Sequence, residues 1–200
     1  MVRELQHRTR NLLAVVQAIS SRTRDSSTTL EEYATKFDRR LGSLSRVQDF
    51  LSREDGEVIE LGEILRLELE ALVPFDHHRV SVEGTRVSMT RQSIQLVALA
   101  FHELITNSLK YGALSGSDGT VRILWNVMDS EAGDRIVRIA WHENGLKERA
   151  SASPKRGFGR TLIERALPQQ LMARTHYELG TETLDCVVEL PLPTESKNSG

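Results

Sequence analysis

The sequence lacks several features that would point to particular classes of protein. Cys186 is the only cysteine, so no disulfide can form within the chain, which fits a reducing compartment. There is no run of about 18 apolar residues and no signal peptide, so we expect a cytoplasmic protein without a membrane segment. The net charge is only −2 and the pI is near 6.3. These values argue against a general nucleic-acid binder and against a membrane-surface protein.

The composition is that of an ordinary soluble globular chain. Its 200 residues are 39% hydrophobic and 27% charged, which allows one large domain or two small ones. The charge is unevenly distributed, because residues 1–24 contain five arginines but only one acid, Glu4. We therefore expect the N-terminal end to favour an acidic partner.

Two apolar stripes at helical spacing predict a helical hairpin at the N-terminus. Thr29 follows a turn-forming segment and is suited to be the N-cap of the second helix. Two helices of about 20 residues bury little by themselves, so we expect each stripe to need a partner. A homodimeric four-helix bundle is the favoured arrangement, and a monomer whose hairpin packs on its own domain is the alternative. The stripes are Leu5, Leu12, Val16 and Ile19, then Leu30, Tyr33, Phe37, Leu41, Leu44, Val47 and Leu51.

His7 lies off the apolar stripe of the first helix. On a helical wheel it shares its side with Arg3 and Arg10. At an ordinary pKa of about 6.5, roughly three quarters of such a histidine is neutral at pH 7, and a neutral imidazole is a nucleophile. The alternative is that His7 is an ordinary polar surface residue.

Residues 101–114 and their lead-in predict a helix with two chemically different sides. Glu103, Asn107 and Lys110 lie on the polar side at i, i+4 and i+7. Glu103 could take a proton or orient a water, Asn107 could offer an oxygen to Mg²⁺, and Lys110 could meet a phosphate. The alternative is the solvated face of a surface helix. We expect Gly112 to end this helix as a left-handed cap.

The rest of the chain predicts an α/β domain with a mixed sheet. A boundary near residue 56 separates the hairpin (1–55) from this domain (56–193), and residues 194–200 are expected to be a disordered tail. Expected elements are a strand at 57–60, a helix at 61–72, a β-hairpin of 79–83 with 85–89 around Gly84, and strands at 120–128, 135–142, 176–180 and 183–191.

Two further segments are placed where binding sites are often built. Glu143 follows the apolar face of a strand at the point where the strand ends, before Asn144 and Gly145; a solvated edge turn is the alternative. We expect residues 146–156 to form a basic, mobile loop that leads into Gly-Phe-Gly at 157–159 and a helix over 161–167. Free amides at such a helix start favour a phosphate. Pro168 is expected to kink or end the helix.

Taken together, these segments resemble the HWE family of sensor histidine kinases, a branch of the ATPases that includes gyrase and the mismatch-repair proteins. The match covers nearly the whole chain, and its motifs are specific in combination. The segment 4–13 is similar to the family's phosphoacceptor box, 102–115 to its N box, 141–143 (Trp-His-Glu) to its Trp-x-Glu motif, and 157–164 to its G box. His102, Trp141 and Glu143 are the residues that mark the family.

The resemblance implies a fold, a reaction and a set of ligands. The fold is α+β: a helical hairpin followed by a two-layer sandwich with a mixed sheet of the Bergerat type. The implied activity is that of an ATP-dependent phosphotransferase, which moves the γ-phosphoryl group of ATP to His7 and then to an aspartate of a response regulator. Mg²⁺ is held through Asn107, with Glu103 acting indirectly, and an upstream sensor domain is expected outside this chain. The residues implied in nucleotide binding are Asn107, Lys110, Tyr111, Glu143, Gly145, Gly157, Phe158 and Gly159.

Some points stay open at this stage. The family usually has Gly-Gly-Pro after Trp-x-Glu, whereas this chain has Asn144-Gly145-Leu146-Lys147, which puts lid opening and nucleotide affinity in question. His102 could orient Glu103 or a phosphate. A docking module that receives its phosphoryl group from another protein is the main alternative function, and a serine or threonine kinase of the same ATPase superfamily is a further one.

Overall fold

The computed structural model describes residues 2–53, 58–73, 78–130, 133–146 and 157–192, with backbone only for 2–8 and 11. The helical elements are α1 (Val2–Asp25), α2 (Leu30–Arg53), α3 (Leu61–Leu72), α4 (Arg91–Tyr111), η1 (Ala113–Ser115), α5 (Phe158–Thr161), the π-helical turn η2 (Leu162–Ala166) and α6 (Leu167–Leu171). The strands are β1 (Val58–Glu60), β2 (Val80–Gly84), β3 (Ser88–Thr90), β4 (Thr120–Asp129), β5 (Arg135–Asn144), β6 (Arg174–Leu179) and β7 (Thr183–Pro191).

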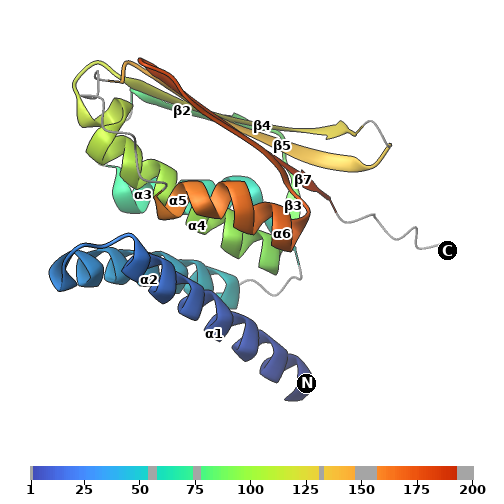
Figure 1. The fold of residues 1–200 in the computed structure, drawn as a ribbon. Helices are drawn as coiled ribbons and strands as arrows, with labels where there is room; N and C mark the ends of the chain where they lie inside the picture. The colour runs from blue at the N-terminus through green and yellow to red at the C-terminus, as the bar shows by residue number, and fades with distance from the viewer. Residues whose placement is uncertain (1, 54–57, 74–77, 131–132, 147–156, 193–200) are drawn as a thin grey trace.

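A mixed sheet forms one outer layer of the molecule, and the predicted fold class is confirmed. The strand order is β2-β4-β5-β7-β6, in which only the β2–β4 pair is parallel. Alternating side chains of β4, β5 and β7 point inward, as the period of two predicts. Helices α3 to α6 cover this inner face, and the hairpin α1–α2 lies on the other side of the helices (Figure 1).

Helix α4 is central because it is enclosed by packing on more than one side. Nearly every side chain from Ile94 to Ile105 is buried. Its apolar side meets the sheet, where Phe101 lies edge-on to Trp141 at 6.0 Å between ring centroids. Its other side contacts α2 and α3. A helix that is buried nearly all round is expected in the middle of a layered domain.

The hairpin shares the core of the domain. Ile19 of α1 and Leu44, Val47 and Leu51 of α2 are buried in the same apolar cluster as the helices beneath the sheet. Thr29 caps α2 as predicted, since its Oγ1 accepts the N–H of Glu32 at 3.1 Å. The described parts of the chain contain no helix that combines the length and apolar character needed to cross a bilayer.

The predicted β-hairpin around Gly84 is wrong. β2 joins the large sheet beside β4, while β3 pairs with β1 in a separate two-stranded sheet. Gly84 lies against the ring of Trp125, where a Cβ would come within 2.1 Å of ring atoms. The glycine is thus required by this close approach and does not form a tight turn. Alternation alone could not reveal the two strands' different partners.

The prediction that Gly112 is a left-handed cap is wrong, and of the two effects predicted for Pro168 the structure excludes an end of the helix. Gly112 has φ −103°, so it is not a left-handed cap. A Cβ there would lie 2.3 Å from Oε2 of Glu143, which explains the glycine by space alone. The helix does not end at Pro168 but continues to Leu171. The turn before Pro168 widens to π geometry, in which the N–H of Leu167 reaches the carbonyl of Leu162.

Candidate functional site

A polar cavity of about 350 Å³ lies between the hairpin and the α4–α5 region. This volume is within the usual range for a small-molecule site. The hairpin contributes Asp25, Ser26, Ser27, Thr28, Lys36, Arg39 and Arg40; α4 contributes His102, Glu103, Thr106, Asn107, Lys110 and Tyr111; and Gly157, Phe158 and Gly159 complete the lining.

The polar side of α4 faces this cavity. Glu103, Asn107 and Lys110 all line it, as their common helical face requires. The structure also brings Gly157, Phe158 and Gly159 to the same cavity from about fifty residues further along the chain. Most of the residues proposed to bind nucleotide therefore share one site.

Gly159 permits the close contact between α5 and α4. A Cβ on Gly159 would lie 2.7 Å from Cβ of Glu103 and 3.5 Å from Nδ2 of Asn107. The first distance is too short for two carbon atoms, so any larger residue would push α5 away from α4. The glycine brings the start of α5 to the wall that carries Asn107.

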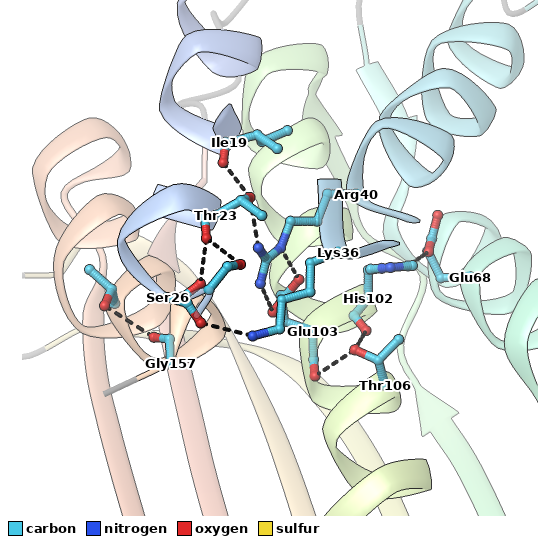
Figure 2. A network of polar contacts seen from close by, with 12 residues as sticks. Ile19, Thr23, Ser26, Lys36, Arg40, Glu68, His102, Glu103, Thr106 and Gly157 are labelled. Carbon is cyan, nitrogen blue, oxygen red and sulfur yellow. Dashed lines mark hydrogen bonds and ion pairs between the residues drawn. The ribbon is translucent and has the colours of Figure 1, made fainter. Parts of the chain in front are cut away.

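Glu103 is held by an arginine of the hairpin. Arg40 Nε donates to Glu103 Oε1 at 2.7 Å, and its Nη2 donates to Oε2 at 3.0 Å, so one guanidinium engages both carboxylate oxygens. Arg40 Nη1 also donates to Thr23 Oγ1 at 2.8 Å, and the guanidinium lies 4.0 Å above the ring of Phe158. Figure 2 shows Arg40 between Thr23 and Glu103.

The Arg40–Glu103 pair is buried, with 7% and 9% of the two side chains exposed. A buried pair costs desolvation, but each partner then depends on the other. In the docked hairpin, each carboxylate oxygen of Glu103 accepts a hydrogen bond from Arg40.

His102 points away from Glu103 to the other side of α4 (Figure 2). Its Nδ1 lies 3.0 Å from Oε2 of Glu68 on α3, and Arg46 of α2 lies 3.2 Å from the same oxygen. Burial alone would raise the pKa of Glu68, but the hydrogen bond and charge of His102 and the charge of Arg46 together lower it below its usual value. His102 thus helps to hold α3, α4 and the hairpin together.

Glu143 lies outside the cavity lining. Its Oε2 accepts hydrogen bonds from Ser108 Oγ and from the N–H of Ala113, both at 2.8 Å, and its Oε1 accepts from Trp141 Nε1 at 2.9 Å. The side chain is 1% exposed. In this arrangement the Trp-x-Glu residues fix the end of α4 and the segment that follows it.

Gly145 is also outside the lining. Its φ is +82°, a conformation that favours glycine, and a Cβ there would meet Cα of Gly119 at 3.0 Å. Leu146 donates its N–H to the carbonyl of Glu182. The predicted mobile loop spans residues 146–156, and all of it except Leu146 lies outside the described residues.

His7 is far from the cavity along α1. It precedes Asp25, which lines the cavity, by eighteen residues of one continuous helix. At a rise of 1.5 Å per residue this corresponds to about 27 Å. The arrangement therefore separates the predicted phosphoacceptor from the predicted nucleotide site.

Lys110 and Arg39 also line the cavity, and among the described side chains neither of them forms an ion pair. Burial lowers the pKa of Lys110, and the positive charge of Arg39 lowers it further, while Glu103 opposes the change. The two cations repel each other across the cavity, which favours an anionic ligand between them.

The hairpin residues of the site were not predicted. One signal was present, because Arg40 occupies the apolar stripe that Leu44, Val47 and Leu51 continue at i+4, i+7 and i+11. A charged residue in such a stripe needs a buried partner. Periodicity cannot identify that partner, which lies 63 residues away.

Comparisons with known proteins give the following matches. The family model described as HWE histidine kinase matches residues 4–86. A blue-light-activated histidine kinase of Brucella anthropi is 32% identical over 200 residues, which are 98% of this chain and 39% of that protein. The chain thus spans about two fifths of the length of the curated relatives it matches.

Two solved structures from Erythrobacter litoralis EL346 are similar in fold. The blue-light activated histidine kinase has a TM-score of 0.60 at 20% identity, with 96% of this chain and 62% of that chain covered. Its histidine kinase domain has a TM-score of 0.58 at 17% identity, with 78% and 74% covered.

Proposed function

We propose that this chain, which is similar to the HWE histidine kinases, is the core of an ATP-dependent protein histidine kinase that phosphorylates His7. The observation that carries this proposal is the polar cavity in which Glu103, Asn107, Lys110 and the 157–159 glycine segment meet. An aspartate on a response-regulator receiver domain would then accept the phosphoryl group, and the arginines of residues 1–24 suit an acidic receiver surface.

The cavity residues fit Mg²⁺ and a nucleotide triphosphate. Asn107 lines the cavity and offers an amide oxygen to a hard cation, and Lys110 offers a charge to a phosphate. When bound, Mg²⁺ would supply neutralisation of the phosphate charge. Tyr111 and Phe158 add ring surfaces to the lining. Glu143 and Gly145 would act indirectly, through the position of the segment after α4.

The transfer step forms a bond between a neutral ring nitrogen of His7 and the γ-phosphorus, and breaks the bond from that phosphorus to the bridging oxygen, so that ADP leaves. Phosphoryl transfer depends mainly on alignment and charge neutralisation. The separation of about 27 Å along α1 means that His7 must move, or come from a second copy of the chain.

Release of the hairpin would remove two obstacles to the reaction together. It would separate Arg40 from Glu103, which frees the carboxylate to orient a water or accept a proton. It would also change the position of α1, which carries His7. The docked arrangement is therefore proposed as a state that precedes transfer, and the division into 1–55 and 56–193 as the two parts that move.

A homodimer through the hairpin remains part of this proposal. The outer side of the hairpin exposes Leu13 by 57% and Leu41 by 38%, which a second copy could cover. Light scattering at several protein concentrations separates a dimer from a monomer with a docked hairpin.

Incubation with γ-labelled ATP and Mg²⁺ tests the function. We expect acid-labile label on the chain, no label on His7→Ala, and strongly reduced label on Asn107→Ala. Label that persists on His7→Ala would reject His7 as the acceptor. Acid-stable label on another protein would instead indicate a serine or threonine kinase.

The second candidate is a phosphotransfer or docking module without catalytic activity. The occupation of both Glu103 oxygens by Arg40 favours it, since such a contact could be permanent. This candidate predicts no nucleotide binding, so calorimetric titration with ATP distinguishes the two functions.

A further inference from the structure

Helix α2 carries three basic residues on the side of the cavity contributed by the hairpin. Lys36, Arg39 and Arg40 line the cavity from α2, and Asn107 and Lys110 line it from α4. The hairpin is thus a second wall of the site that is proposed to hold the nucleotide.

The three basic residues are not equivalent, because two of them have anionic partners. Arg40 is bound to Glu103 through two hydrogen bonds. Lys36 Nζ contacts Glu32 Oε1 at 2.6 Å and donates to the carbonyl of Ser26 at 2.9 Å. Within the described part of the chain, no acid is found in an ion pair with Arg39.

Arg39 and Lys110 therefore bring positive charge to the cavity from both walls. Arg39 is half-buried, so part of its hydration is lost. Burial lowers the pKa of Lys110, and the charge of Arg39 lowers it further. Bringing two cations together costs energy unless an anion lies between them. A chain of phosphates has the negative charge that residues on both walls would attract.

We propose that Arg39 is a phosphate-binding residue, and that the nucleotide site is a composite of the hairpin and α4. The inference rests on the proposed function and deepens it. It has a thermodynamic consequence: if the nucleotide contacts both walls, then nucleotide binding strengthens hairpin docking, and docking strengthens binding by the same factor. The docked chain would bind the nucleotide while His7 is still distant. This complex would therefore form before phosphoryl transfer.

Binding of adenosine, AMP and a non-hydrolysable ATP analogue to the full chain tests the proposal. We expect Arg39→Gln to weaken binding of the analogue about tenfold, AMP less, and adenosine not at all, because only the phosphates lose a charged partner. Arg53→Gln is the matched control, since Arg53 is exposed on the same helix and outside the cavity. This control should bind all three ligands like the wild type.

Amide hydrogen exchange provides an independent measurement of the coupling. The analogue should slow exchange in α2 of the wild-type chain and should do so less in Arg39→Gln. Arg39→Gln binding of the analogue at wild-type affinity, or an equal loss for adenosine, would overturn the inference and leave the kinase proposal intact. If the wild-type chain binds no nucleotide, the proposed function itself fails.

Discussion

The two glutamates that the sequence marks most clearly are held in different ways. Glu143 receives its three hydrogen bonds from Ser108, Ala113 and Trp141, all within the α/β domain. Glu103 accepts two hydrogen bonds from Arg40, on a helix of the hairpin. The first carboxylate is fixed by its own domain, whereas the second is fixed by an element that could separate from it. Glu143 is therefore held by one part of the fold, whereas the contacts of Glu103 depend on how the hairpin packs on the domain.

Replacement of Arg40 should have the largest effect. Arg40→Met leaves the charge of Glu103 buried without its partner, which costs about 3–5 kcal/mol while the hairpin is docked. We expect the hairpin to separate from α4 so that this cost is avoided. Urea denaturation should therefore show a lower stability, and exchange of α2 amides should become much faster.

A double variant provides the control for Arg40. Arg40→Met combined with Glu103→Leu removes both charges and should recover most of the lost stability, because an apolar pair can replace a buried ion pair. If Arg40→Met is as stable as the wild type, the ion pair does not hold the hairpin, and the contrast with Glu143 disappears.

Replacement of Glu143 should have the next largest effect and should act on the α/β domain. Glu143→Gln keeps the shape but offers an amide group to a site that contains only donors, so we expect a loss of about 2–3 kcal/mol in urea denaturation. Exchange in α2 should change no more than exchange in the sheet.

The neighbouring His142 forms an exposed pair with Asp185, so His142→Ala should change stability by less than about 0.5 kcal/mol. Equal losses in the two variants would contradict this account.

The positions of Glu103 and Glu143 in their helix and strand could be predicted from the sequence. The i, i+4, i+7 spacing placed Glu103, Asn107 and Lys110 on one face, and the alternation of β5 placed Glu143 on the same buried face as Trp141. Local periodicity is enough for such predictions, because it depends on neighbouring residues alone.

The partners of these residues could not be anticipated. Arg40 reaches Glu103 across 63 residues, and Ser108 reaches Glu143 across 35. The route of the chain after Gly84 depends on the ring of Trp125, 41 positions away. Each of these contacts is set by how whole elements pack, and short-range patterns of polarity contain no information about it.

Glu68 forms a second ion pair with the hairpin, through Arg46, and this pair predicts how stability depends on pH. The pKa of Glu68 is lowered in the folded state, so its charged form stabilises the fold at pH values above its unfolded pKa of about 4.5. This contribution is lost as the pH falls through the lower folded pKa. We expect Glu68→Gln to be about 1.5–2 kcal/mol less stable at pH 7, since it loses the contacts of His102 and Arg46.

Urea denaturation from pH 7 to pH 3 measures this effect. The difference between the wild type and Glu68→Gln should shrink as the pH falls below 4.5, because the carboxylate then loses its charge. Glu32, whose pKa is lowered to about 2 chiefly by the Lys36 hydrogen bond, titrates in the same acid range. It is present in both proteins and cancels from the difference. Parallel curves down to pH 3 would show that the Glu68 carboxylate does not stabilise the fold through its charge.

The smallest effect should come from the cap of α2, at the end of the hairpin that borders the cavity. Thr29→Ala removes the oxygen that accepts the N–H of Glu32, which should cost about 1 kcal/mol in urea denaturation. Thr29→Ser keeps the hydroxyl and should cost little, so equal losses in the two variants would mean that the cap does not stabilise α2. Because the cap belongs to the hairpin, the faster amide exchange of Thr29→Ala should be confined to the start of α2. The N–H of Ala113, which donates to Glu143, should exchange as slowly as in the wild type. This result is expected if the two glutamates belong to parts of the molecule that open separately.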